Sequence, residues 1–161
     1  MIEKDIEAKI VAAVEALGLP GLVVRGAWQA AAAGEVKDEE SASAPAALFV
    51  HVGPRSFETF GICIASMDVA LLLAIRADLC PTGSALETYA DPIAAILTRW
   101  NMEMCHTEDC GMAVDGFTPG GVQMSGGSGP EFDRDASSWS IVWNFTLRGY
   151  VAHADHTQEQ E

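Results

Sequence analysis

The chain has 161 residues, of which 23 are acidic and 9 are basic, so its formal net charge at pH 7 is -14. This length fits a single domain, and a hydrophobic fraction of 49% is typical of globular proteins. Nine basic residues are too few to neutralise the phosphates of a nucleic acid when 23 acidic residues repel them. This excludes a passive nucleic-acid-binding protein and disfavours a membrane surface as a partner.

We expect neither a membrane span nor a targeting signal. No apolar stretch reaches the roughly 18 residues that cross a bilayer. The N-terminus lacks a basic segment followed by an apolar one, so it does not match a secretory signal. Four cysteines without a CxxC pair indicate reduced thiols. The pattern predicts a soluble protein made in a cytoplasm.

The first predicted elements are a helix and a strand. Apolar residues recur every three or four positions from Ile2 to Leu17, which predicts an amphipathic helix. Gly18 and Pro20 end this helix, because Gly accepts a left-handed turn and Pro cannot continue a helix. A strand then begins at Leu22 and runs to about Trp28.

Residues 29–45 are small or charged and show no apolar period. Such a segment cannot bury enough surface to offset the entropy of ordering it, so we predict a long, mobile, acidic loop. Loops above about 12–15 residues in a compact domain are usually functional or disordered. The acidic residues assigned to a protein interface in this loop are Glu35, Asp38, Glu39 and Glu40.

Two strands are predicted in the middle of the chain, at 46–53 and at about 68–79, because apolar residues alternate there with other residues. A loosely extended segment connects them. It contains Arg55, Phe57 and Phe60, and aromatic residues with Arg on a loop are the composition of interface hot spots. These three residues complete the predicted protein interface.

A second helix is predicted to begin at Ser84, which forms a capping box with Glu87. Its apolar face extends to Trp100, and Pro92 inside it predicts a kink or a restart of the helix. Residues 101–116 are expected to be irregular and acidic.

The C-terminal third predicts two strands. A short strand at 117–125 is followed by a glycine-rich turn at 126–130 and a charged segment at 131–135. An aromatic-rich apolar face opposite a polar one predicts a half-buried antiparallel strand over 138–148. The apolar face is formed by Trp139, Ile141, Trp143, Phe145 and Leu147, and the polar face by Ser138, Ser140, Asn144, Thr146 and Arg148. Residues 152–161 are expected to form a disordered tail.

The predicted order is therefore α-β-β-β-α-β-β. Strands flanked by two helices favour an α+β fold, with a single antiparallel or mixed β-sheet and both helices packed on one face. Residues 1–151 are assigned to one domain. Long strands also suggest that neighbouring subunits complete the sheet edges in a closed assembly.

Three short motifs resemble ligand sites, but none matches its type fully, so no metal or cofactor is predicted. Cys105, His106 and Cys110 are suitable zinc ligands, but one Cys-x4-Cys spacing is more typical of an acidic surface loop. Glu131, Asp133 and Asp135 alternate like calcium ligands, but the glycine and glutamate that a calcium-binding loop requires are missing. A third motif resembles a phosphate-binding loop but lacks its lysine, and its members are Gly121, Gly126, Gly127 and Ser128.

The layout resembles the tail terminator or tail completion proteins of tailed bacteriophages, of the minor tail protein U type. The resemblance covers most of residues 1–151 and is one of size, order and pattern. The segments that carry it are MIEKDIEAKIVAAVEALGL, LVVRGAW, PAALFVHV, DVALLLAIRADLC, TGSALETYADPIAAILTRW and SSWSIVWNFTLRGYV.

This resemblance implies a virion protein of the phage tail, assembled in the bacterial host cytoplasm. Its copies are expected to form a ring, typically a hexamer, that caps the head-proximal end of the tail tube and ends tube polymerisation. The implied partners are the tail tube protein and a head connector or neck protein. DNA would pass through without specific binding, repelled by an acidic lumen. The family supplies no catalytic residues, so no enzyme activity is predicted.

Other functions stay open at this point. The chain is alternatively another phage tail, neck or head-completion structural protein, or a small acidic protein-binding module that acts through residues 29–45. A third alternative is a metal-dependent hydrolase built around Cys105, His106 and Cys110.

Overall fold

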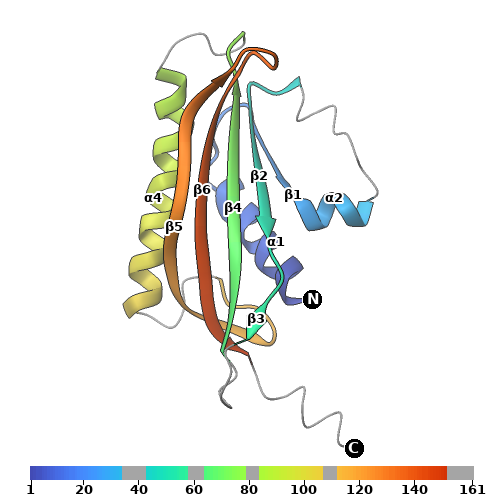
Figure 1. Ribbon diagram of the computed structural model, residues 1–161, viewed down its shortest axis with the longest axis vertical. Coiled ribbons are helices and arrows are strands. Elements are labelled where there is room, and N and C mark those ends of the chain that lie inside the picture. Colours follow the sequence, from blue (N-terminus) through green and yellow to red (C-terminus); the bar gives the residue numbers. More distant parts are fainter. Residues whose placement is uncertain (34–42, 58–63, 79–83, 107–111, 152–161) are drawn as a thin grey trace, which may run out of the picture.

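The computed structural model describes residues 1–33, 43–57, 64–78, 84–106 and 112–151 (Figure 1). The remaining residues, which include 34–42 of the predicted loop and the predicted tail 152–161, lie outside the described residues. The elements in chain order are α1 (Ile2–Glu15), β1 (Leu22–Gly26), α2 (Ala27–Ala33), β2 (Ala46–Val52), β3 (Ser56–Phe57), β4 (Ile64–Arg76), α4 (Ser84–His106), β5 (Phe117–Asp133) and β6 (Ser138–Val151).

The strands form one mixed sheet in the order β1-β2-β4-β6-β5, and β3 pairs with the beginning of β4. Only the β1–β2 pair is parallel among the described strands. A parallel pair requires a crossover connection, and residues 27–45, which begin with α2, carry the chain between these two strands. The predicted α+β fold with a single mixed sheet is confirmed, with a short helix and a two-residue strand added to the predicted order.

The two long helices pack against one face of the sheet. Helix α1 contacts β1 and β2, while α4 contacts β5 and β4, and their apolar residues belong to one core. In Figure 1, α1 lies behind the sheet and α4 runs beside β5. Trp100, Phe117 and Phe145 are among the largest side chains that this core buries completely.

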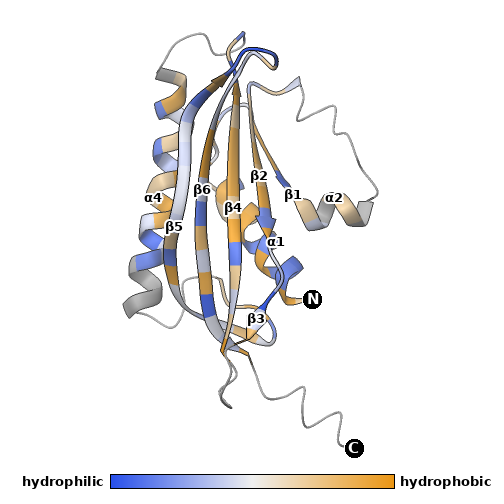
Figure 2. Cartoon of the chain, viewed as in Figure 1, coloured by the Kyte–Doolittle hydropathy of each residue, from blue (hydrophilic) through white to orange (hydrophobic). Residues whose placement is uncertain are grey.

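Strands β4 and β6 form the centre of the sheet. All 13 residues of β4 pair with β6, from Ile64 opposite Tyr150 to Arg76 opposite Ser138. Burial alternates along β4, so one side faces the helices and the other faces outward. Figure 2 shows that β4 is mostly hydrophobic along its length, because its outward positions other than Asp68 and Arg76 also carry small or apolar residues.

The prediction of a strand to Trp28 followed by a loop is wrong at its boundary. Strand β1 ends at Gly26, and Ala27–Ala33 form helix α2. The alanine-rich run has high helix propensity. In addition, the Glu7 carboxylate accepts a hydrogen bond from the backbone N–H of Trp28, at 2.8 Å. This cap comes from another helix, so no local sequence signal indicates it.

The predicted glycine-rich turn at 126–130 is also wrong, because β5 continues to Asp133. Three register shifts along the β5–β6 pair absorb the extra residues. Gly126 and Gly129 have positive φ angles, so these glycines serve the irregular strand rather than a turn. The chain reverses between β5 and β6 at residues 134–137.

Helix α4 is longer than predicted. It runs as one helix from Ser84 to His106 with Pro92 inside it, so the predicted restart at this proline does not occur. The first six residues of the segment predicted to be irregular, 101–106, are helical. The charge and low apolar content of this segment suggested an irregular structure. Adding residues to a helix that has already formed costs little entropy, so the helix continues through it.

Gly149 should be intolerant of any side chain. A Cβ at this position would overlap the backbone oxygen of Thr118 and approach the Phe117 ring to 2.7 Å. Overpacking of this kind costs about 1–3 kcal/mol, so we expect Gly149→Ala to lower the free energy of unfolding by that amount in urea denaturation. Gly121→Ala is the matched control, because a Cβ there meets nothing within 4 Å. Equal losses in the two variants would contradict the packing described.

Candidate interaction surface

Two buried carboxylates on α1 hold the segments that follow β1 and β2. Glu3 and Glu7 lie one turn apart, and their exposed fractions are 3% and 0%. Buried charges are costly unless they are hydrogen-bonded. Glu3 Oε1 accepts hydrogen bonds from the backbone N–H and the Nε–H of Arg55, the latter at 2.8 Å. Its second oxygen, Oε2, is buried without a hydrogen-bond partner among the described residues.

The Glu7 carboxylate fits against β1 because Gly26 has no side chain. A Cβ at Gly26 would overlap this carboxylate, so the sequence requires glycine here for close approach. The helix that Glu7 caps is also tied to β2, since Trp28 Nε1 donates to the Val52 carbonyl oxygen at 2.9 Å. These contacts fix α1, α2 and the end of β2 relative to one another.

The predicted interface residues Arg55 and Phe57 lie just before and within β3, which Figure 1 shows at the lower end of the sheet. The guanidinium carbon of Arg55 lies 5.9 Å from the centroid of the Phe57 ring, which is within cation–π distance. Phe57 is 63% exposed, whereas Arg55 is half-buried by its ion pair with Glu3. The other predicted interface residues lie outside the described residues. They are Phe60, Glu35, Asp38, Glu39 and Glu40.

The outward face of the sheet carries an apolar row that crosses three strands. Phe49 of β2 pairs with Leu72 of β4, which pairs in turn with Val142 of β6. Phe49 is 39% exposed and Leu72 is 37% exposed. We call these three residues the outer row. Within the described part of the chain, no helix packs on this face. The alternation in the sequence indicated the sidedness of each strand, but the row exists only through the pairing of the strands.

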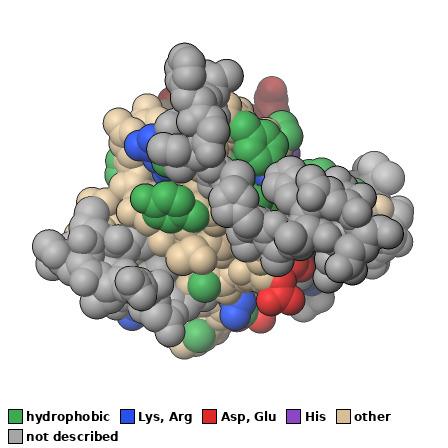
Figure 3. Space-filling model, turned by 90° about the horizontal axis from the view of Figure 1, so that it is seen from below, with side chains coloured by type: hydrophobic (Ala, Val, Ile, Leu, Met, Phe, Trp, Pro, Cys, Tyr) green, Lys and Arg blue, Asp and Glu red, His purple; other side chains and the backbone are tan. Residues whose placement is uncertain are grey.

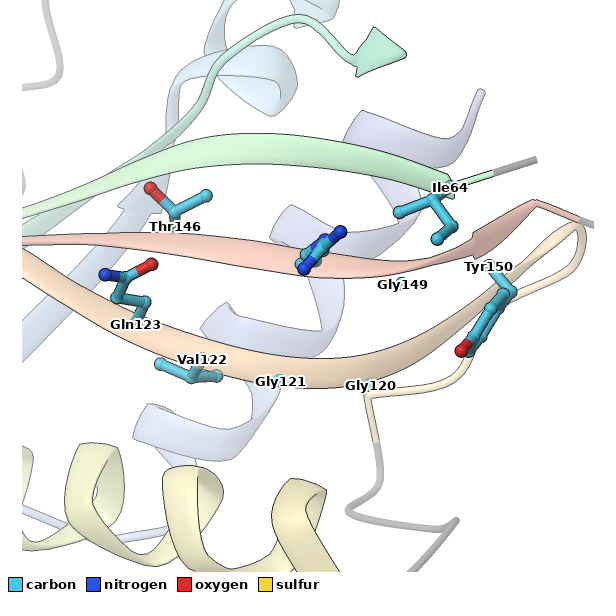
Figure 4. A pocket seen from close by; sticks show the side chains of 9 residues that line it. Ile64, Gly120, Gly121, Val122, Gln123, Thr146, Gly149 and Tyr150 are labelled. Atoms are coloured by element: carbon cyan, nitrogen blue, oxygen red, sulfur yellow. The ribbon is translucent and has the colours of Figure 1, made fainter. Parts of the chain in front are cut away.

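A hollow of about 370 Å³ lies on the same outward face at its lower end. Figure 4 shows side chains from β4, β5 and β6 around it, with α1 on the far side of the sheet. Its main lining residues are Ile64, Gly121, Gln123, Thr146, Arg148 and Tyr150. We call this site the lower hollow. Among its described lining residues, Arg148 is the one with a charge.

The acidic residues singled out as calcium-like lie at the opposite end of the sheet, in and beside the turn between β5 and β6. We call residues 131–137 the hairpin tip. Asp133 accepts a hydrogen bond from the backbone N–H of Asp135 at 2.9 Å, so this carboxylate stabilises the turn. Within the described part of the chain, no group of three potential metal-ligating side chains is found.

The glycines of the phosphate-loop-like pattern lie within strand β5, without a following helix N-terminus to hold a phosphate. The side chains of Cys105 and His106, and all of Cys110, lie outside what the structure describes. The metal-dependent hydrolase therefore stays an untested alternative.

The negative charge is unevenly distributed. Ten of the 23 acidic residues lie in the five undescribed segments, together with only one of the 9 basic residues, Lys37. The described part is thus closer to neutral than the whole chain. Figure 3, which views the lower end, shows basic and acidic side chains interspersed with hydrophobic ones.

The sequence matches no known family model, and no curated protein is significantly similar to it. In the described part of the chain, every helix is too short or too polar to cross a membrane.

Glu7→Ala should lower the free energy of unfolding by about 1–3 kcal/mol, because it removes the buried carboxylate that accepts the hydrogen bond of the partly buried Trp28 N–H. The matched control is Glu15→Ala, which removes an exposed carboxylate from the same helix and should change stability by less than about 0.5 kcal/mol. Chemical denaturation followed by circular dichroism measures both. Similar stability of the two variants would contradict the role assigned to Glu7.

Proposed function

We propose that this chain is a structural subunit of a bacteriophage tail, whose copies form a ring that caps the head-proximal end of the tail tube. The ring, a hexamer, ends tube polymerisation and joins the tail to the head connector. The α+β fold that the resemblance implies is the fold the chain adopts, with an opening helix, a second long helix and a closing strand in the expected places. This agreement supports the proposal.

The observation that carries the proposal is the uncovered outward face of the sheet. Two helices cover one face, while the outer row leaves apolar side chains in contact with water on the other. Exposed apolar surface of this kind marks sites where proteins assemble. In a ring subunit, such a face becomes buried against neighbouring proteins, which removes this apolar surface from water.

The contacts between subunits are not edge-to-edge strand pairing at β5. Within the described residues β5 pairs with β6 alone, so its other side is an edge of the sheet. Pro119 and Pro130 remove two backbone donors from this strand, and register shifts interrupt its regular spacing. Glu131 and Asp133 add charge at its end. These features prevent the β5 edge from pairing with another chain, so at this side of the sheet the faces and ends remain as assembly surfaces.

The excess of acidic residues is consistent with a ring whose central channel lets DNA pass. A ring through which a genome passes must not retain it, and like charges repel the phosphates. With ten acidic residues and one base outside the described segments, most of the excess charge belongs to segments that connect or follow the ordered elements. An acidic lumen formed by these segments would let DNA pass without specific binding.

The direct test adds the purified chain to polymerising tail tube protein and measures tube length and tube ends by negative-stain electron microscopy. We expect rings at one end of each tube and no further growth from that end. Tubes of unchanged length with bare ends, at saturating concentrations of the chain, would overturn the proposal.

The outer row offers a variant that should separate folding from assembly. Leu72→Asp places a charge on the outward face while the core side of β4 is unchanged, so we expect a folded protein that no longer forms rings. Ala8→Asp adds the same charge at an exposed position of α1 and should assemble normally. Light scattering on both variants gives the readout, and normal rings from Leu72→Asp would show that the outer row is not buried on assembly.

A further inference from the structure

The two ends of the central strands carry groups of opposite character. The lower hollow lies where β4 begins and β6 ends, and Arg148 lies on its wall. The hairpin tip lies where β5 ends and β6 begins, and its charged residues are Glu131, Asp133, Asp135 and one base, Arg134. The tip is therefore acidic, while the described lining of the hollow contributes a positive charge.

Gly121 follows the first register shift of the β5–β6 pair and lines the lower hollow, where there is room for a side chain. A Cβ at Gly121 would meet nothing within 4 Å, and the φ angle of this residue is not in the left-handed region. Glycine inside a strand weakens it and often marks a place where a ligand or another backbone approaches closely. Here the neighbouring space is the hollow itself, so the missing side chain leaves room for an occupant.

The hairpin tip is preorganised to insert into a cavity. The Asp133 carboxylate fixes the turn, and the carbonyl of Ser137 accepts a hydrogen bond from the N–H of Ala77 at 2.8 Å. Phe132 packs on Trp139 with 5.0 Å between ring centroids and is still 46% exposed. A rigid tip loses little entropy on docking, which increases affinity.

No copy can insert its own tip into its own hollow. The two sites are separated by the length of the β4–β6 pairing, which covers the 13 residues of β4 and therefore extends about 40 Å. Because both sites are built on the same paired strands, their separation is fixed. A tip that enters a lower hollow must come from a second copy.

We propose that the hairpin tip of one copy docks into the lower hollow of the next, with the Asp135 carboxylate near the Arg148 guanidinium. This inference rests on the proposed ring and names the contact between its subunits. A contact between two different sites is heterologous, and repetition of such a contact closes into a ring when the rotation permits. Tyr150 and Ile64 supply apolar contact around the charged pair.

The first test fills the hollow. Gly121→Val has space for its Cβ and should fold like the wild-type protein, but its side chain occupies the docking space. We expect its self-association to weaken at least tenfold in sedimentation velocity experiments. Ala8→Val is the control, because it adds a comparable side chain at an exposed position of α1, outside the hollow and on the other face of the sheet, and it should associate normally.

The second test reverses charges. Arg148→Glu and Asp135→Arg should each weaken self-association at least tenfold, since each places like charges at the contact. A chain that carries both substitutions restores opposite charges at every contact and should recover assembly. Circular dichroism of each variant confirms folding. Folded single variants that do not regain assembly when the substitutions are combined would overturn the pairing of Asp135 with Arg148.

The outcomes distinguish this inference from the proposed function. Normal ring formation by Gly121→Val and by both single charge variants would overturn the docking contact and leave the ring intact. If those variants form rings but no longer bind tail tubes, the hollow receives the tube protein, which also overturns a second copy as its occupant. A wild-type chain that never self-associates, even with tail tubes present, would overturn both proposals.

Discussion

The two long helices cover one face of this sheet and leave the other uncovered among the described residues, and the surfaces of the molecule depend on that arrangement. The apolar side chains of β2, β4 and β6 that face α1 and α4 form the core. The opposite face retains Phe49, Leu72 and Val142 as a continuous row in contact with water. Burial on one side stabilises the monomer, and the apolar side chains exposed on the other form the surface that we propose is buried on assembly.

Polar contacts between residues far apart in the sequence fix the positions of the segments that follow β1 and β2. Glu3 and Glu7 are buried on α1, where one holds Arg55 and the other caps α2. Carboxylates in such positions destabilise a protein unless their partners are in place, so they specify one arrangement of the surrounding segments. At the hairpin tip an exposed carboxylate, Asp133, stabilises the turn through a local hydrogen bond. The two ends of the sheet therefore carry distinct surfaces.

The sequence predicts the sheet and its two long helices well, because the regular spacing of apolar residues within each of these segments can be read from the local sequence. The alternation along β4 and β6 identified the buried side of each strand. Helix α2 was missed because its cap, Glu7, lies on another helix. The full length of β5 was missed because glycines that accommodate register shifts look, in sequence, like a turn.

The candidate surface was only partly predictable for a similar reason. Arg55 and Phe57 were identified from composition, and the structure brings them together. The outer row and the lower hollow arise from the pairing of distant strands, so their members carry no common signal in the sequence. The role in an interface stays a prediction for the acidic residues that lie outside the described residues, which are Glu35, Asp38, Glu39 and Glu40.

We propose that this chain assembles into a closed ring with a fixed number of subunits. Native mass spectrometry tests it most directly, because a closed ring gives one discrete mass, whereas an open chain of contacts gives a series. We predict a single species of six copies of the 17.1 kDa chain, formed at high concentration or on tail tubes. A 17.1 kDa species alone under both conditions, or an unlimited ladder of masses, would contradict it.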